Sequence, residues 1–354
     1  MKELSSTPTN PLLQIPNPKE IETREILKEC IEARASLAYL SRVYDSFKPQ
    51  KVLFENLATI ETLSVLTKSK AFETARFDVV AELKKLYVGQ NSRSKLRDIH
   101  LFLQSSHQST WVKKPSVIEL YEEAAKTVML SEQDEVFTAM EDLIDPNNAH
   151  FKNVSAWVDF ELSFREDHLD PLINQAISHV SFRKLNHYKG NAELIGSLAD
   201  PLTMKLRKLL SYPCLTLHHY FFENKDEYEA YLSEFRQQGH WRQWVSFYCS
   251  ATSDRAQKIT RWSDQLVNLY SRTAHQISRL IPANKAKDIT ELIFTRPFCQ
   301  RNDVELCPNI ADNETLARHL KRLVEHGILE QEKHSYTVVY RNRALVDLIL
   351  EAIE

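Results

Sequence analysis

The sequence predicts a mainly α-helical protein that ends in a winged helix-turn-helix. Only five glycines occur in 354 residues, and a hydrophobic share of 43% with a charged share of 26% is typical of a globular, helix-rich chain. Apolar residues recur at helical spacing through most of the sequence. The final segment contains three helical patterns and then two short strand patterns, which is the order of elements in a winged helix.

Composition and charge exclude several classes of protein. The formal net charge of −3 gives no global attraction to nucleic acid or membrane, so nucleic-acid binding would need a local basic patch. The five cysteines lack Cys-x-x-Cys spacing, which argues against a disulfide framework or a zinc site and favours small buried side chains in a reducing compartment. No apolar run approaches about 18 residues, and the start lacks a signal-peptide core. We therefore expect a cytoplasmic protein that has no metal site and no membrane partner.

We expect three consecutive domains. Residues 1–115 form an N-terminal arm and helical cap, residues 116–282 a helical core, and residues 283–354 the winged helix. Four prolines up to Pro18 predict an extended arm over residues 1–19, because proline opposes helix. Apolar spacing then predicts helices at about 21–43, 55–68, 72–87, 94–104 and 116–145.

The middle of the chain contains a helix, a loop and a second helix. Apolar side chains from Leu172 to Leu185 recur at helical spacing, with His179 expected to face the core, and the pattern breaks at Gly190–Asn191. Asp200 followed by Pro201 predicts that the next helix starts there, with Asp200 as its N-cap, and runs to about Ser211. The loop between them is either an ordinary turn or an anion site made of backbone N–H groups.

Two further helices are predicted before the C-terminal part, over residues 224–238 and about 252–281. Trp241 and Trp244 lie three residues apart, which places both on one helix face, and packing in the core is the usual reason for such a pair.

The C-terminal part has a candidate recognition helix. Helical patterns occur around residues 289–294, in a short second segment, and from Asn313 to His326, where Gly327 closes the helix before strands at 328–331 and 336–340. The third helix carries Arg318, Lys321 and Arg322 against two glutamates, a net charge of plus one. Because duplex binding depends on several phosphate contacts, DNA binding and protein docking or dimerisation both stay open.

Segments spread from about residue 20 to 340 resemble the Fic (filamentation induced by cAMP) family of bacterial protein adenylyltransferases, in the form with an N-terminal helical cap and a C-terminal winged helix. The resemblance implies a Fic-like helical core. The matching segments are Ile21–Lys28 with Glu32–Arg34, His179-x-x-Phe182, Tyr220 through Asn224–Lys225 to Tyr228, Gly239–Trp244, Glu291–Phe294 with Pro297–Cys299, and Leu320–Leu329.

The active-site motif of that family is degenerate in this chain. The family loop reads His-x-Phe-x-(Asp/Glu)-Gly-Asn-Gly-Arg-x-x-Arg, and with one residue deleted its Gly-Asn falls on Gly190–Asn191. Asn186 then occupies the position of the catalytic histidine, and Lys189 precedes the gap that removes the metal-binding acid. The remaining family positions hold Ala192 for the second glycine, Glu193 for the first arginine and Gly196 for the second. Using His187 as the histidine would need a loop two residues short.

These replacements remove the chemistry that the resemblance implies. An asparagine amide is no general base near pH 7, and without the acid no ligand for Mg²⁺ is evident. Glu193 would repel phosphate by about 4 kcal/mol for a close charge pair at an effective dielectric of about 20. A helix that restarts only at Asp200 would displace the anion site. The inhibitory glutamate of the family is also missing, because Ser69 stands in its place near Val65 to Lys70.

Three hypotheses follow. The first is a Fic-like pseudoenzyme that binds an unidentified protein partner and needs no cofactor, as a monomer or a homodimer. The second is a divergent nucleotidyltransferase that uses ATP and Mg²⁺, with His187 or His179 as base and Lys189 on the phosphates. The third is a DNA-binding regulator. It rests on basic side chains of the winged helix, namely Arg318, Lys321, Arg322, Arg341 and Arg343.

Overall fold

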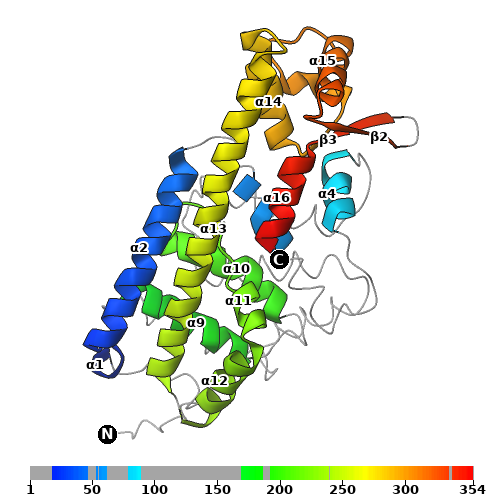
Figure 1. Ribbon diagram of the computed structural model, residues 1–354. Helices are drawn as coiled ribbons and strands as arrows, with labels where there is room; N and C mark the ends of the chain where they lie inside the picture. Colours follow the sequence, from blue (N-terminus) through cyan, green and yellow to red (C-terminus); the bar gives the residue numbers. More distant parts are fainter. Residues whose placement is uncertain are drawn as a thin grey trace, which may run out of the picture. The chain divides into compact units, whose positions relative to one another are not determined.

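The computed structural model describes residues 18–46, 53–54, 56–61, 79–88, 169–185, 192–238, 240–334 and 337–353. The chain divides into two compact units, the first made of residues 1–41 and 102–257 and the second of residues 42–101 and 258–354. Helices α2 (Arg24–Ser46) and α13 (Trp241–Ser278) contribute residues to both units (Figure 1). The three consecutive domains expected from the sequence remain a prediction.

The described part of the first unit is helical. It contains α1 (Pro18–Ile21), α9 (Pro171–Leu185), α10 (Ala192–Leu206), α11 (His218–Glu223) and α12 (Lys225–Gln238), together with parts of α2 and α13 (Figure 1). The extended arm predicted for residues 1–19 is wrong at its end, because Pro18 is the first residue of α1. Proline suits that position, since the N–H it lacks would have no partner inside the helix. The rest of the arm lies outside the described residues.

The core of the first unit forms around α9. The apolar stripe predicted from Leu172 to Val180 is confirmed, since these side chains are fully buried. The indole Nε1 of Trp244 on α13 donates a hydrogen bond of 2.7 Å to the carbonyl of Ala176. The core role predicted for Trp241 is wrong, because that side chain is only half-buried. Helix α13 begins at Trp241, about ten residues earlier than the apolar spacing indicated.

The predicted start of a helix at Asp200 is also wrong. Helix α10 begins at Ala192, directly after Gly190–Asn191, and it includes both Asp200 and Pro201. The side chain of Asp200 binds His179 on α9 and is therefore engaged between helices and not in an N-cap. The local sequence signal for an N-cap at Asp200 was therefore outweighed by the contact of Asp200 with His179, 21 residues away.

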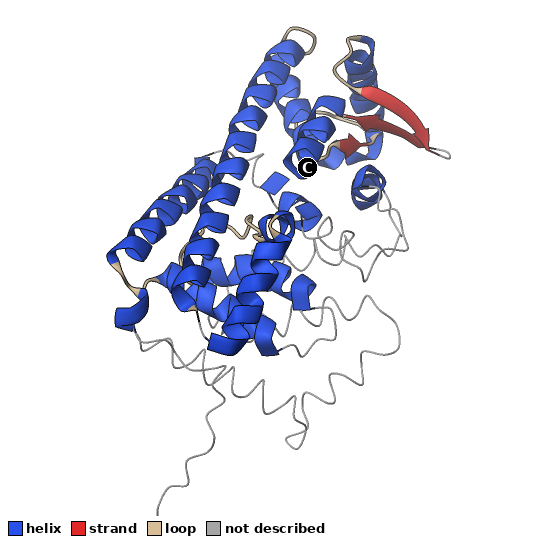
Figure 2. Ribbon diagram, turned by 60° about the horizontal axis from the view of Figure 1, so that its bottom comes forward, coloured by secondary structure: helices blue, strands red, loops and turns tan. Residues whose placement is uncertain are grey.

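The second unit contains a three-stranded antiparallel sheet. Strand β1 (Phe298–Cys299) pairs with β3 (Thr337–Arg341), which pairs with β2 (Glu330–His334), so the order is β1-β3-β2. Helices α14 (Ala283–Thr295), η3 (Arg301–Leu306) and α15 (Asn313–Glu325) precede the β2–β3 hairpin, and α16 (Arg343–Ile353) follows it. The strands of the sheet are drawn in red in Figure 2. Helix α4 (Val79–Val88) contacts β1. The predicted order of three helices and two strands is confirmed. Strand β1 was not predicted, because a strand of two residues is too short to produce a periodic pattern in the sequence.

The ends of α15 follow the signals in the sequence. The Asp312 carboxylate caps the helix by accepting a 2.7 Å hydrogen bond from the backbone N–H of Thr315. Leu316, Leu320 and Leu323 form its buried face. Gly327 has φ of +70°, a left-handed conformation that glycine adopts without strain, and it ends the helix as predicted.

The mainly helical fold class is confirmed. The five cysteines are buried and free, as the spacing indicated. No helix within the described ranges combines the length and apolar character that crossing a membrane requires. The helices predicted over 94–104 and 116–145, and the segment from Val65 to Lys70, lie outside the described residues.

Candidate functional site

Helices α9 and α10 pack against each other and frame the loop that the sequence singled out. Helix α9 ends at Leu185, the residue before Asn186, and α10 begins immediately after Asn191. The loop residues Asn186, His187, Lys189, Gly190 and Asn191 lie outside the described part of the chain. Glu193 is the second residue of α10, and its side chain lies outside that part as well. The structure therefore describes the frame of the loop and not its side chains.

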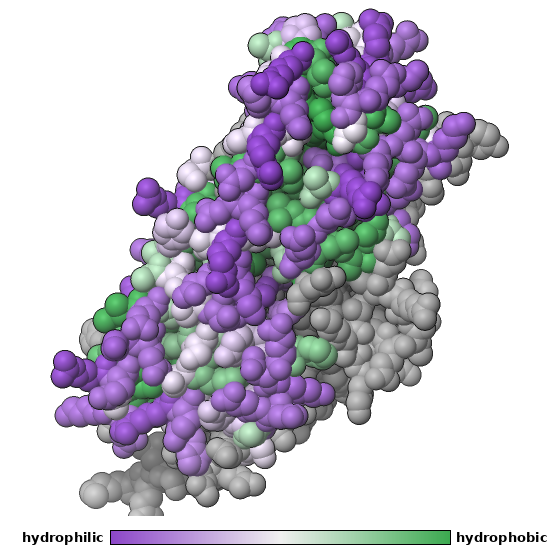
Figure 3. All heavy atoms as spheres, viewed as in Figure 1, coloured by the Kyte–Doolittle hydropathy of each residue, from purple (hydrophilic) through white to green (hydrophobic). Residues whose placement is uncertain are grey.

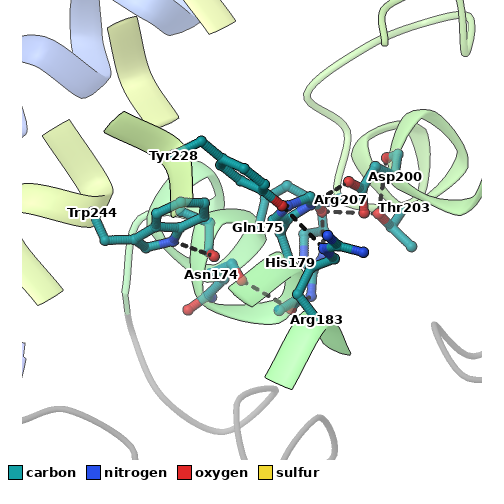
Figure 4. Close-up of polar contacts among 11 residues, drawn as sticks. Asn174, Gln175, His179, Arg183, Asp200, Thr203, Arg207, Tyr228 and Trp244 are labelled. Atoms are coloured by element: carbon teal, nitrogen blue, oxygen red, sulfur yellow. Dashed lines mark hydrogen bonds and ion pairs between the residues drawn. The ribbon is translucent and has the colours of Figure 1, made fainter. Parts of the chain in front are cut away.

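A chain of polar groups connects α9, α10 and α12 (Figure 4). His179 on α9 is only 1% exposed, and its Nδ1 lies 2.5 Å from Oδ2 of Asp200 on α10. The other ring nitrogen, Nε2, lies 3.0 Å from the hydroxyl of Tyr228 on α12. Arg183, one turn further along α9, donates from Nε to the same hydroxyl over 3.1 Å. Four residues thus connect three helices.

The direction of two hydrogen bonds in this chain follows from the chemistry of their partners. A guanidinium only donates, so the oxygen of Tyr228 accepts from Arg183. A carboxylate only accepts, so Nδ1 of His179 carries the hydrogen that binds Asp200. Both ring nitrogens are engaged and the ring is buried. The hypothesis that His179 serves as a catalytic base has no support from this geometry.

A second group of polar contacts joins the same two helices. Oε1 of Gln175 accepts a 3.0 Å hydrogen bond from Thr203 and a further one from Arg207, which follows α10. Arg207 also donates from Nη2 to Ser178 over 2.7 Å. Buried polar groups cost free energy unless they are paired, so these contacts fix α9 and α10 in one arrangement.

Aromatic rings pack against this chain. The ring of His179 stacks on Trp244 with a centroid distance of 5.7 Å and an interplanar angle of 17°. The Tyr228 ring stacks on Phe221 at 4.6 Å and 10°. Apolar surroundings strengthen the polar contacts inside them. The described contacts of these side chains hold helices together.

A second buried histidine, His218, has a different environment. Its side chain is 4% exposed, and neither ring nitrogen has a hydrogen-bond partner among the described residues. Burial is the main reason why the pKa of His218 falls to about 3, with smaller effects from the charges of Asp200, His179 and Arg183. A Cβ atom at Gly196 on α10 would lie 3.4 Å from Nε2 of His218. Alanine would fit there, in contact with the His218 ring.

We predict that replacing His218 by leucine removes a pH dependence of stability. The pKa of His218 is lower in the folded than in the unfolded chain, so protons bind preferentially to the unfolded chain below about pH 6.5. The wild type should then lose up to about 1.4 kcal/mol of unfolding free energy per pH unit on acidification, relative to the variant. Urea titrations at several pH values measure this difference, and parallel curves for both proteins would contradict the assignment.

The basic residues predicted to bind nucleic acid are in the second unit. Arg318, Lys321 and Arg322 are exposed on α15. Arg341 and Arg343 are less suited, because Arg341 lies 3.8 Å and Arg343 3.4 Å from the carboxylate of Asp347. Helices α9 and α10 belong to the first compact unit, whereas α15 belongs to the second. Within the described residues no cluster of three or more His, Cys, Asp or Glu side chains suits a metal ion.

Comparison with known proteins identifies the C-terminal part and the fold. Residues 269–345 match the family described as protein adenylyltransferase SoFic-like, C-terminal domain. The structure is also similar to that of a Fic family protein from Desulfovibrio desulfuricans G20, with a TM-score of 0.50 over 90% of this chain and 96% of that chain. The first comparison shows that the C-terminal part is similar to that domain family. At 15% sequence identity the second comparison shows the fold alone.

The Fic-like fold expected from the sequence is thereby confirmed. Sequence reasoning missed the partners of His179, namely Asp200 and Tyr228, and the burial of His218. One signal could have indicated them. His179 stands between Ile177 and Val180 on an apolar helix face, and a polar side chain in that position needs a buried partner.

Proposed function

We propose that this Fic-like protein is a pseudoenzyme that acts by binding or regulation and does not transfer AMP. The observation that carries the proposal is the start of α10 at Ala192, which puts Glu193 in the first turn of that helix. The positive end of the helix dipole stabilises a carboxylate there by about 0.3–1 kcal/mol. The helix end that would otherwise attract phosphate thus has an acidic residue of its own, where the resemblance implies an arginine.

Two further observations agree with a loss of catalysis. In the alignment that the resemblance implies, an asparagine, Asn186, stands at the position of the base, and the alternative base His179 is buried and fully hydrogen-bonded. The position of the second arginine is Gly196, and the edge of His218 lies against it. The Cβ atom of an arginine there would already be in contact with the His218 ring. The contact between Gly196 and His218 supports the view that the loss of the second arginine involves the packed core and not only the loop.

Calorimetric titration with ATP and Mg²⁺ tests the proposal. We expect no binding by the wild type at millimolar ATP. Glu193→Arg is expected to restore measurable binding if repulsion by this carboxylate is the main block. Glu229→Arg on α12 makes the same change of charge at an exposed position of the same unit and serves as the matched control, for which no binding is expected.

Two other outcomes would contradict the pseudoenzyme proposal. Micromolar binding of ATP by the wild type would favour a divergent nucleotidyltransferase, with His187 as the candidate base and Lys189 on the phosphates. Transfer of labelled AMP to any protein, abolished by Asn186→Ala or Asn191→Ala, would overturn the pseudoenzyme proposal. An assay of AMP transfer in a cell lysate therefore accompanies the titration.

A further inference from the structure

Helix α2 has two apolar faces. One face packs in the core, and its side chains are at most 5% exposed, namely Ile26, Cys30, Ala33, Leu37 and Leu40. The other face is open to solvent. It contains Ile31, which is 66% exposed, and Tyr39, which is 50% exposed. Packing within this chain therefore explains the first face and not the second.

The exposed apolar residues of α2 form a continuous stripe. Ala35 and Ala38 are also exposed and lie between Ile31 and Tyr39. Residues three and four apart are neighbours on a helix surface, so these four positions share one face. Figure 3 shows hydrophobic side chains within the hydrophilic surface over α2, at the left edge of the view. We call Ile31, Ala35, Ala38 and Tyr39 the α2 stripe. Single exposed apolar side chains are normal, whereas a continuous apolar patch marks an interaction site.

Charged residues border the α2 stripe at both ends. Lys28 and Glu32 are at its N-terminal end, with side chains that are 79% and 64% exposed. Arg42 and Asp45 are at its C-terminal end and are exposed as well. In the part of the chain that the structure describes, Lys28 and Glu32 approach each other only to 4.0 Å, and neither Arg42 nor Asp45 has an ion-pair partner. An apolar centre with a polar rim is the usual anatomy of a protein interface.

The order of these charges is self-complementary in one orientation. Along α2 the four residues are positive, negative, positive and negative, and helical geometry fixes their spacing because all of them belong to one helix. A second copy of α2 can pack antiparallel to the first, with the two alanines of the stripe at the crossing point. Lys28 then lies opposite Asp45 of the other copy, because both are about equally far from the centre. Glu32 lies opposite Arg42 of the other copy for the same reason.

The parallel orientation is disfavoured by the same charges. Each charged residue would then meet its own counterpart in the other copy, and like charges repel. The small side chains of the alanines allow two helix backbones to approach closely at the centre. The charges therefore select both the partner, which is a second copy, and its direction.

We propose that the α2 stripe is the interface of a symmetric homodimer of this chain. The two copies pack α2 against α2 about a two-fold axis, so that the same surface supplies both halves of each ion pair. The contact between two single helices is smaller than the roughly 1,200–2,000 Å² of a standard interface, so we expect a weak dimer with a dissociation constant on the order of 100 µM.

Sedimentation velocity of the full chain, at concentrations below and above this value, tests the proposal. Glu32→Lys and Arg42→Glu, made singly, each place like charges opposite one another and should weaken the dimer about tenfold or more. The double variant restores opposite charges with exchanged signs and should dimerise like the wild type. Glu229→Lys on α12 makes the same change of charge at an exposed position of a different helix. This matched control should leave the dimer unchanged.

A separate variant tests the apolar part of the interface. Ile31→Asn removes the most exposed apolar side chain of the stripe without a change of charge and should also weaken the dimer. Because Ile31 contributes little to the core, the helical content measured by circular dichroism should stay the same.

Three results would overturn the proposal. A chain that remains monomeric at about 1 mM would leave the stripe to a different protein. A dimer that neither single charge reversal weakens would use another surface. A double variant that fails to recover dimerisation would contradict the antiparallel pairing. The proposal involves neither the loop nor Glu193, so the ATP titration neither supports nor weakens it.

Discussion

Replacing Asp200 by alanine is expected to lower the free energy of unfolding by about 3–5 kcal/mol. The substitution leaves the Nδ1 hydrogen of His179 buried without an acceptor and opens a gap between α9 and α10. It also weakens the chain through Tyr228 to Arg183, because the orientation of the imidazole ring is no longer fixed. Urea denaturation followed by circular dichroism measures the loss.

Asp200→Asn is the matched control for this prediction. The asparagine amide has nearly the same shape and keeps an oxygen that accepts the hydrogen bond from Nδ1 of His179. It should therefore cost clearly less than alanine. Equal losses for the two variants would mean that the charge of Asp200, and not its hydrogen bond, provides the stability. A loss below about 1 kcal/mol for alanine would show that this contact is not important for the fold.

Trp244→Ala should have an effect of similar size, about 3–5 kcal/mol. The indole is fully buried, stacks on the His179 ring and donates to the carbonyl of Ala176. Truncation creates a cavity between α9 and α13 and leaves the carbonyl of Ala176 without its indole donor. The same urea titration measures the result.

Trp241→Ala tests whether burial is the cause. Trp241 has the same side chain on the same helix, three residues away, but it is only half-buried. Its loss should be clearly smaller than that of Trp244. Similar losses at both positions would contradict the arrangement of α13 against α9, and would favour the original expectation that both indoles pack in the core.

The candidate site could be predicted from the sequence only in part. The break at Gly190–Asn191 and the replacement of the family's motif residues are visible in a single line of sequence, because each concerns neighbouring positions. The partners of His179 were not visible. Asp200 and Tyr228 come from other helices, 21 and 49 residues away, and no local pattern indicates which side chains meet in a packed core.

The sequence by itself determined the local features of this protein. The buried stripe of α9, the end of α15 at Gly327 and the hairpin after it follow from periodicity and from one backbone conformation that favours glycine. Only the tertiary structure decided where α10 begins and which side chains meet around His179. Both depend on contacts between distant residues, Asp200 with His179 and Tyr228 with His179, and such contacts outweigh local preferences worth about 1 kcal/mol.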